Sequence, residues 1–148
     1  VKIGVGSYAK SANELSNAFL QGSSAIKMGI MSNAKGNIFS YKEFIMMRMI
    51  EEIPESTLNK YLEILLDSGA KEILSDPEML CTAEEFLENS LNISETSRRL
   101  FMHRNTLMYR LDKIEKAMGL NIRRFSDAVT FRIILILYKH INHWFFNK

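Results

Sequence analysis

The chain has 148 residues, of which 47% are hydrophobic and 24% charged, and its formal net charge is +2. This composition allows one substantial hydrophobic core and excludes a disordered or fibrous protein. The single cysteine, Cys81, excludes an internal disulfide and favours a reducing, cytoplasmic location, while the longest apolar run, residues 133–138, is far shorter than the ~20 residues of a membrane helix.

The first residues, "VKIGV", are typical of a short strand. No basic segment of a signal peptide precedes them. Because the sequence starts on Val1, inside this strand pattern, we expect it to be part of a longer chain.

A glycine pattern follows the first strand. "GVGSYA" places Gly4, Gly6 and Ala9 in the G-x-G-x-x-A spacing of dinucleotide-binding turns. That function needs an acidic residue at the end of a second parallel strand, and "IFSYKEF" offers none before Glu43. A tight turn between a strand and a helix is therefore the favoured interpretation.

The next elements follow from apolar spacing and from Gly and Pro. Leu15, Ala18, Phe19, Ala25 and Ile26 have roughly helical spacing. A turn over 32–37 and a second strand over 38–41 come next, and the remaining chain is expected to be helical. The predicted helices are 41–53 ending at Pro54, 56–69 ending at Gly69, and a short one over 71–76 closed by Pro77.

Four further helices are predicted in the second half. Thr82 and Glu85 have the spacing of a capping box, so one helix is expected to begin at Thr82. Ser94 is the expected N-cap of a short helix over 94–101. A longer helix begins after His103 and is closed by Gly119, and a last helix, apolar on nearly all sides, begins at Ser126.

Charge is distributed unevenly along the chain. Residues 1–91 carry 8 Lys and Arg against 13 Asp and Glu, a net charge of −5. Residues 92–124 carry 8 against 3, a net charge of +5. Concentrated basic charge in one segment is typical of a surface that binds nucleic acid, although a solvated basic face is the simpler alternative.

The basic segment has the pattern of a helix-turn-helix motif over 94–118. Leu100 and Met102 are suited to anchor the turn, and Leu107, Leu111 and Ile114 lie on one face of the second helix. Phe101 occupies the turn position that often holds Gly, so we expect the turn to follow another geometry.

The outward side of the second helix then supplies the candidate DNA contacts. The residues expected to reach base edges in the major groove are Arg104, Asn105, Thr106, Met108 and Tyr109. The residues expected to contact phosphates are Arg98, Arg99, His103, Arg110, Lys113, Arg123 and Arg124. For His103, capping of the turn is an equally favoured role.

A family resemblance rests on this same stretch. "FLENSLNISETSRRLFMHRNTLMYRLDKIEKAMGLNIRRFSDAVTFRIILIL" resembles the C-terminal DNA-binding domain of the PucR/CdaR family of bacterial regulators, and its core, Leu100 through Gly119, is distantly similar to the nucleoid protein Fis. Met108 departs from the family, which often has a basic residue there. The segment "IGVGSYAKSANELSNAFLQGSSAIKMG", with "FSYKEF", is similar to the end of the degenerate GGDEF-like domain that precedes the DNA-binding domain in these regulators.

The resemblance implies a mainly α fold: a Fis-like helical domain over 41–148, preceded by a partial α+β segment over 1–40. It also implies a transcriptional regulator, of a catabolic operon of the purine or sugar-diacid type, that binds double-stranded operator DNA as a homo-oligomer. A small-molecule effector would bind a domain upstream of this sequence, and no membrane partner is expected.

Two alternatives remain beside DNA binding. The basic helix suits an interaction module that binds an acidic protein partner. His140 and His143 lie three residues apart on the last helix, as metal ligands can, but no Cys or carboxylate cluster accompanies them. No arrangement of residues indicates catalysis, so we expect neither an enzyme nor a bound cofactor or metal.

Overall fold

The computed structural model describes residues 1–32, 34–66 and 68–146. The chain is mainly helical, as predicted, and forms two compact units, Val1–Ile53 and Pro54–Lys148. The division lies after residue 53 rather than after the expected residue 40. The reason is that Phe44, which follows the second strand, is buried against Ala25, Met28 and Phe39 of the first unit.

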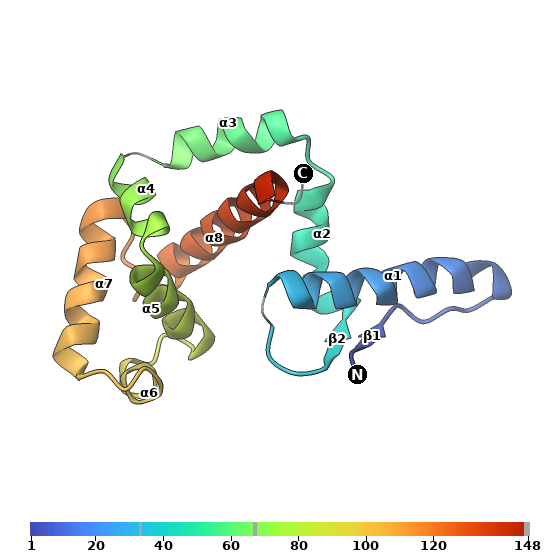
Figure 1. Ribbon diagram of the computed structural model, residues 1–148, viewed down its shortest axis with the longest axis horizontal. Coiled ribbons are helices and arrows are strands. Elements are labelled where there is room, and N and C mark those ends of the chain that lie inside the picture. Colours follow the sequence, from blue (N-terminus) through green and yellow to red (C-terminus); the bar gives the residue numbers. More distant parts are fainter. Residues whose placement is uncertain (33, 67, 147–148) are drawn as a thin grey trace. The chain divides into compact units, whose positions relative to one another are not determined.

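The first unit contains a small parallel sheet crossed by one long helix (Figure 1). Strand β1 (Ile3–Val5) pairs with β2 (Ile38–Ser40), with Gly4 opposite Phe39. Helix α1 (Ala12–Met31) connects the two strands, as a parallel pair requires. A 3₁₀ turn, η1 (Tyr41–Phe44), and helix α2 (Ile45–Glu51) complete the unit. Both predicted strands are confirmed.

The glycine pattern after β1 has a packing role. A Cβ atom added at Gly4 would lie 1.9 Å from the carbonyl oxygen of Gly22, and one added at Gly6 would lie 2.1 Å from that of Ala18. Both carbonyl oxygens belong to α1. Only glycine, which has no Cβ atom, lets this part of the chain approach the helix so closely. Strand β2 ends at Ser40 without an acidic residue. The interpretation as a turn between a strand and a helix, rather than as a dinucleotide site, fits this arrangement.

Much apolar surface of the first unit is exposed within the unit. Leu15, Phe19 and Leu20 of α1 are all exposed, although their spacing is helical. The buried side of α1 carries small residues instead, Gly22, Ala25 and Gly29, with Met28. Because small residues let a helix lie close to a sheet, the packed side of α1 is the one with less side-chain bulk.

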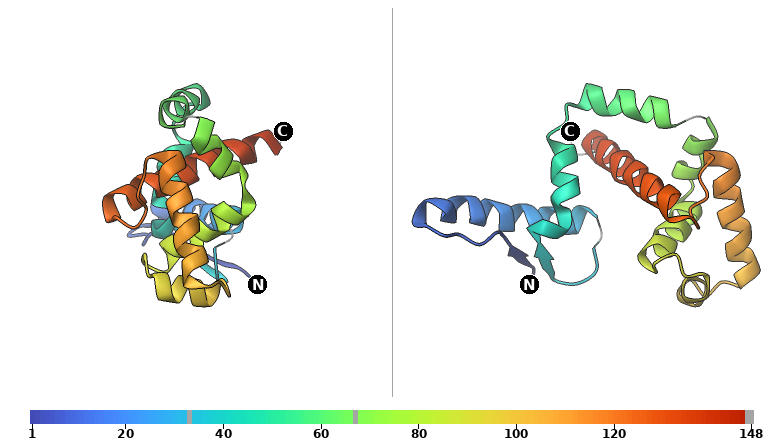
Figure 2. Two further views of the ribbon diagram at one scale, coloured as in Figure 1. Left: turned by 90° about the vertical axis from the view of Figure 1, so that its left-hand side faces the viewer. Right: turned by 180° about the vertical axis from the view of Figure 1, so that it is seen from behind.

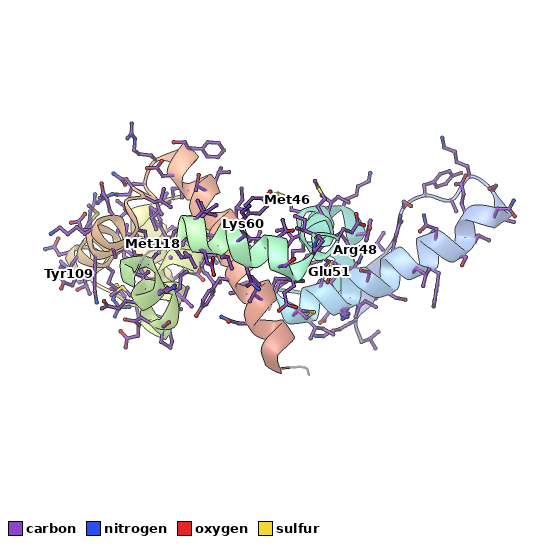
Figure 3. The ribbon with its side chains drawn as sticks, turned by 90° about the horizontal axis from the view of Figure 1, so that it is seen from above. Met46, Arg48, Glu51, Lys60, Tyr109 and Met118 are labelled. Atoms are coloured by element: carbon purple, nitrogen blue, oxygen red, sulfur yellow. The ribbon has the colours of Figure 1, made fainter. Side chains whose placement is uncertain are left out.

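Helix α2 ends before Pro54, as predicted. Its last turn carries an ion pair between Arg48 Nη1 and Glu51 Oε2 at 2.7 Å, and the two side chains lie next to each other in Figure 3. Hydrogen bonds to Glu51 and Tyr41 raise the pKa of Arg48 above its ordinary value.

The described residues of the second unit form six helices, and Figure 2 shows them from two further directions. In chain order they are α3 (Glu55–Leu65), α4 (Ser68–Ser75), α5 (Pro77–Glu88), α6 (Ile93–Arg99), α7 (Arg104–Met118) and α8 (Phe125–Phe146). Helix α7 packs against α4, α5 and α6, while α3 packs against α8. Phe86, Leu107, Ile114 and Phe131 are fully buried and form part of the core that holds α7 in place.

The helix boundaries predicted at Gly69 and at Thr82 are both wrong. Helix α3 ends at Leu65, and Gly69 lies inside α4, where a Cβ atom would come within 2.8 Å of the carbonyl oxygen of Ala117. Helix α5 begins at Pro77 rather than at Thr82, because Asp76 caps it by accepting hydrogen bonds from the backbone amides of Glu78 and Met79.

The helix boundaries marked by Pro77 and by the end of α7 agree with the prediction. Helix α4 ends at Ser75, and Gly119 closes α7 in the left-handed conformation, with φ at 67°. The last helix begins at Phe125, one residue before the expected Ser126. Asp127, in its first turn, accepts a hydrogen bond from the backbone amide of Asn121 and so ties the connection to the helix.

Candidate nucleic-acid interface

Helix α6 begins one residue earlier than predicted. The predicted N-cap, Ser94, lies within the helix, and Asn92 caps it instead by accepting a hydrogen bond of 3.0 Å from the backbone amide of Glu95. Thr96, in the middle of the helix, is fully buried, and its hydroxyl donates to the backbone oxygen of Asn92. The hydrogen bonds fix the start of the short first helix of the motif, and the buried side of this helix packs on α5 and α7.

The turn between α6 and α7 has the hydrogen bonds of a Schellman motif. The amide of Phe101 donates to the carbonyl of Arg98, and the amide of Met102 donates to that of Ser97. Phe101 occupies the position that usually holds glycine and adopts a φ of 50°. The expectation that the turn would follow another geometry is therefore wrong: the geometry is kept, and a phenylalanine takes the left-handed conformation. Leu100 and Met102 are partly buried at the turn.

Helix α7 is capped by the residue before it. Nδ1 of His103 accepts a hydrogen bond of 3.2 Å from the backbone amide of Asn105. The structure thus gives His103 the capping role, one of the two roles expected for it. With the cap in place, the first turn of α7 presents Arg104, Asn105 and Thr106, whose side chains are all exposed.

The two faces of α7 are as predicted. Leu107, Leu111 and Ile114 are buried and anchor the helix to the rest of the unit. On the opposite side, Tyr109 is 68% exposed and lies at the outer side of the helix (Figure 3). Met108 is partly buried, so less of its side chain is available to a partner than that of Tyr109.

Glu95 holds two of the predicted phosphate contacts. Its carboxylate accepts hydrogen bonds from Arg98 Nη2 at 2.7 Å and from Arg99 Nε at 2.9 Å, and Arg99 also lies 3.5 Å from Glu85. Hydrogen bonds from Arg98 and Arg99 lower the pKa of Glu95, and the bond to Glu95 raises the pKa of Arg99. Both guanidinium groups are exposed, since the pairs lie on the surface of α6.

Arg110 and Arg123 are held more firmly. Arg110 donates to Thr82 Oγ1 at 2.9 Å and to Glu78 Oε2 at 2.7 Å, so its guanidinium connects α7 to α5. Arg123 binds Asp112 at 2.8 Å and Glu115 at 2.6 Å. Partial burial alone would lower the pKa of Arg123, but the two carboxylates outweigh it and raise this pKa. Sequence reasoning did not anticipate these partners, because they come from other turns or elements.

Four cations of the segment have no ion pair within the described part of the chain. They are Arg104, Lys113, Lys116 and Arg124. Lys116, exposed in the last turn of α7, was not among the predicted contacts, although it is a basic residue on the same helix as Lys113. A free cation can bind an anion without first losing an internal partner, so these four are the most available charges.

The structure also bears on the metal alternative. His140 is partly buried on α8, and the side chain of His143 lies outside the described residues. Within the described ranges, no group of three or more His, Cys, Asp or Glu side chains is placed to hold a metal ion. In the same ranges, no helix has both the length and the apolarity needed to cross a membrane.

A short capped helix, a tight turn and a second helix with an exposed polar first turn define a helix-turn-helix domain. Residues 79–137 match the family described as the PucR C-terminal helix-turn-helix domain. Residues 79–137 are thus similar to the helix-turn-helix domain of PucR-type regulators, the similarity that the sequence resemblance predicted.

Relatives in two bacteria share this similarity. The chain is 28% identical to a purine catabolism regulatory protein of Bacillus subtilis over 96% of this chain and 27% of that protein. It is 26% identical to a proline-responsive transcriptional activator of the same organism, over 94% of this chain and 34% of the activator. It is 45% identical to a carbohydrate diacid regulator of Escherichia coli, over 28% of this chain and 11% of that regulator. The chain therefore spans about a third or less of the length of these relatives.

Proposed function

We propose that the chain is a sequence-specific, DNA-binding transcriptional regulator that reads the major groove with α7. The observation that carries this proposal is the first turn of α7, where Arg104, Asn105 and Thr106 are exposed above a buried anchor, Leu107. Arginine pairs with guanine through two hydrogen bonds and asparagine pairs with adenine in the same way, so this turn has the chemistry of base recognition. Thr106, Met108 and Tyr109 complete the proposed base contacts.

Phosphate contacts are proposed on both sides of α7. Lys113 and Arg124 have no ion pair among the described residues to lose, and His103, Arg98 and Arg99 lie at or before the turn. Arg110 and Arg123 belong to the proposed set as well, but each would exchange a carboxylate partner for a phosphate. Their contribution to affinity is therefore expected to be smaller than that of a free cation.

The wider role is proposed from the relatives. The relatives are named as a purine catabolism regulatory protein, a proline-responsive transcriptional activator and a carbohydrate diacid regulator. These names support the control of a catabolic operon. We propose that the chain acts as a homo-oligomer on repeated or inverted half-sites, since one such helix reads only a few base pairs. We also propose, because the relatives are much longer than this chain, that an effector is bound outside this sequence. We further propose that residues 1–40 are the end of a degenerate GGDEF-like domain.

The test begins with selection of duplexes from random-sequence DNA by the 148-residue chain. Arg104→Ala is then compared with Arg132→Ala, which removes the same charge from α8, where Arg132 is paired with Glu88. Arg104→Ala should reduce the preference for one base pair of the selected sequence by about 1–3 kcal/mol, and Arg132→Ala should leave it unchanged. Fluorescence anisotropy on selected and scrambled duplexes measures both.

A salt titration separates DNA binding from the binding of an acidic protein. Neutralising several phosphates gives a log–log slope of about −0.9 for each phosphate contacted. Selection without an enriched sequence, together with a shallow salt slope, would contradict the proposal and favour the acidic-partner alternative.

A further inference from the structure

Phe101 is the most unusual residue of the helix-turn-helix. Its side chain is 98% exposed, and its backbone has a φ of 50°. A non-glycine residue in the left-handed region destabilises the fold, and an exposed phenyl group gains nothing from hydrophobic burial. Glycine at this position would remove both disadvantages. The residue therefore lowers the stability of the domain without packing against the rest of the unit.

The surroundings of Phe101 favour a polyanion as its partner. Arg98 and Arg99 precede it in the last turn of α6, and Arg104 follows at the start of α7. The segment 92–124 has a net charge of +5, so a second copy of this basic surface would be repelled. An apolar side chain among cations is suited to a partner that offers both negative charge and apolar surface.

Double-stranded DNA offers this combination at the border of the major groove. In a docked helix-turn-helix the first helix crosses the backbone and the second enters the groove, so the turn between them lies over the sugar–phosphate wall. A phenyl group forms no strong hydrogen bond with phosphate, and the apolar surface available there belongs to the deoxyribose. We propose that Phe101 packs against a backbone deoxyribose at the edge of the groove and so strengthens binding without reading sequence. This proposal rests on the proposed DNA-binding function.

The test compares three variants of the 148-residue chain. Phe101→Gly removes the ring and the strain, and Phe101→Tyr keeps the ring. The matched control is Ser90→Gly, because Ser90 has a φ of 55° at the same position of a second Schellman motif, between α5 and α6. The probe is a fluorescent duplex of about 30 base pairs with an arbitrary fixed sequence, long enough for two half-sites. Affinity is measured at several salt concentrations, and melting temperature is measured without DNA.

Phe101→Gly should raise the melting temperature by about 2–6 °C, because the left-handed conformation is no longer strained. The same variant should bind the duplex about tenfold more weakly, with an unchanged salt slope, since the lost contact is apolar. Ser90→Gly should raise the melting temperature and leave affinity unchanged. Phe101→Tyr should bind within about twofold of the wild type.

Several outcomes would overturn the proposal. Wild-type affinity in Phe101→Gly would show that the ring does not contact DNA, and a lower melting temperature would show that it packs within the protein. If replacing thymine by uracil in the probe duplex weakened wild-type binding as much as Phe101→Gly does, the contact would belong to a thymine methyl group instead. If the wild type bound no duplex at all, the proposed function itself would fail, which distinguishes the two failures.

Discussion

Individual basic residues of the helix-turn-helix differ in how readily they are available to an anion. Arg104 and Lys113 have no internal ion pair among the described residues, Arg98 shares the carboxylate of Glu95, and Arg110 is held by α5. Sequence alone gives all four the same formal charge. Their availability depends on partners that the fold brings near, so their relative contributions to binding cannot be ranked from sequence.

Glu95 should make stability depend on pH. Hydrogen bonds from Arg98 and Arg99 lower its pKa below the ordinary value of 4.5. A carboxyl with a lower pKa in the folded state stabilises the fold above its unfolded pKa, and this contribution is lost as the pH falls through the folded pKa. The wild type should therefore melt above Glu95→Gln near neutral pH, and the difference should vanish in acid. Melting temperatures from about pH 7 to about pH 3 measure it. A difference that stays constant across this range would contradict the assignment.

At the scale of the helices, periodicity predicted more than capping patterns did. The apolar stripe of Leu107, Leu111 and Ile114 is buried as expected, because their spacing leaves only one face of α7 for the core. The capping-box pattern at Thr82 was misleading. This threonine lies inside α5, where its hydroxyl donates to the carbonyl of Glu78 at 2.7 Å. A threonine hydroxyl can satisfy either role, and only the neighbouring Asp76 and Pro77 decide between them.

Gly69 and Phe101 show a second limit of sequence reasoning. From the sequence, Gly69 was predicted to end a helix. In the structure, glycine is required there because α4 approaches the backbone of α7 at Ala117, far away in the sequence. Phe101 led to the prediction of a different turn geometry. In the structure, the Schellman hydrogen bonds are formed and Phe101 adopts the left-handed conformation. At Gly69 a tertiary contact decides the role of the residue, whereas at Phe101 the hydrogen bonds of the turn override the backbone preference of the side chain.

Arg110 should contribute to the packing of α5 on α7. Its side chain is only 20% exposed and binds both Thr82 and Glu78, so Arg110→Ala should destabilise the chain by about 1–2 kcal/mol, allowing for the exposed position of Glu78. Arg98→Ala, which removes an exposed i,i+3 pair, is the matched control and should change stability much less, because solvent screens this pair. Urea unfolding of both variants measures this. Equal stability of the two would contradict a structural role for Arg110.

On the scale of the whole molecule, the two units differ in how completely they bury their apolar residues. The first unit has a two-stranded sheet, and Ile3, Val5 and Ile38 of its strands are exposed within it, as is Phe19 of α1. A sheet of two strands is only marginally stable by itself. The second unit has its own core, which includes Leu58, Phe86, Leu111 and Phe131. The sequence predicted the two short strands and the helices, but not this asymmetry, because helical spacing alone did not show that Leu15 and Phe19 of α1 would be exposed.

This difference predicts that residues 54–148 fold without the first unit, whereas residues 1–53 do not fold alone. The second unit is compact by itself, and its own helices pack on one another, with α4, α5 and α6 against α7 and α3 against α8, so it contains a core of its own. The shorter piece should unfold in one cooperative transition and retain its helical circular dichroism signal, while residues 1–53 should give the signal of an unfolded chain. The affinity of residues 54–148 for an arbitrary duplex should match that of the 148-residue chain, compared per domain and at equal salt. Non-cooperative melting of residues 54–148 would show that the first unit completes the core of the second.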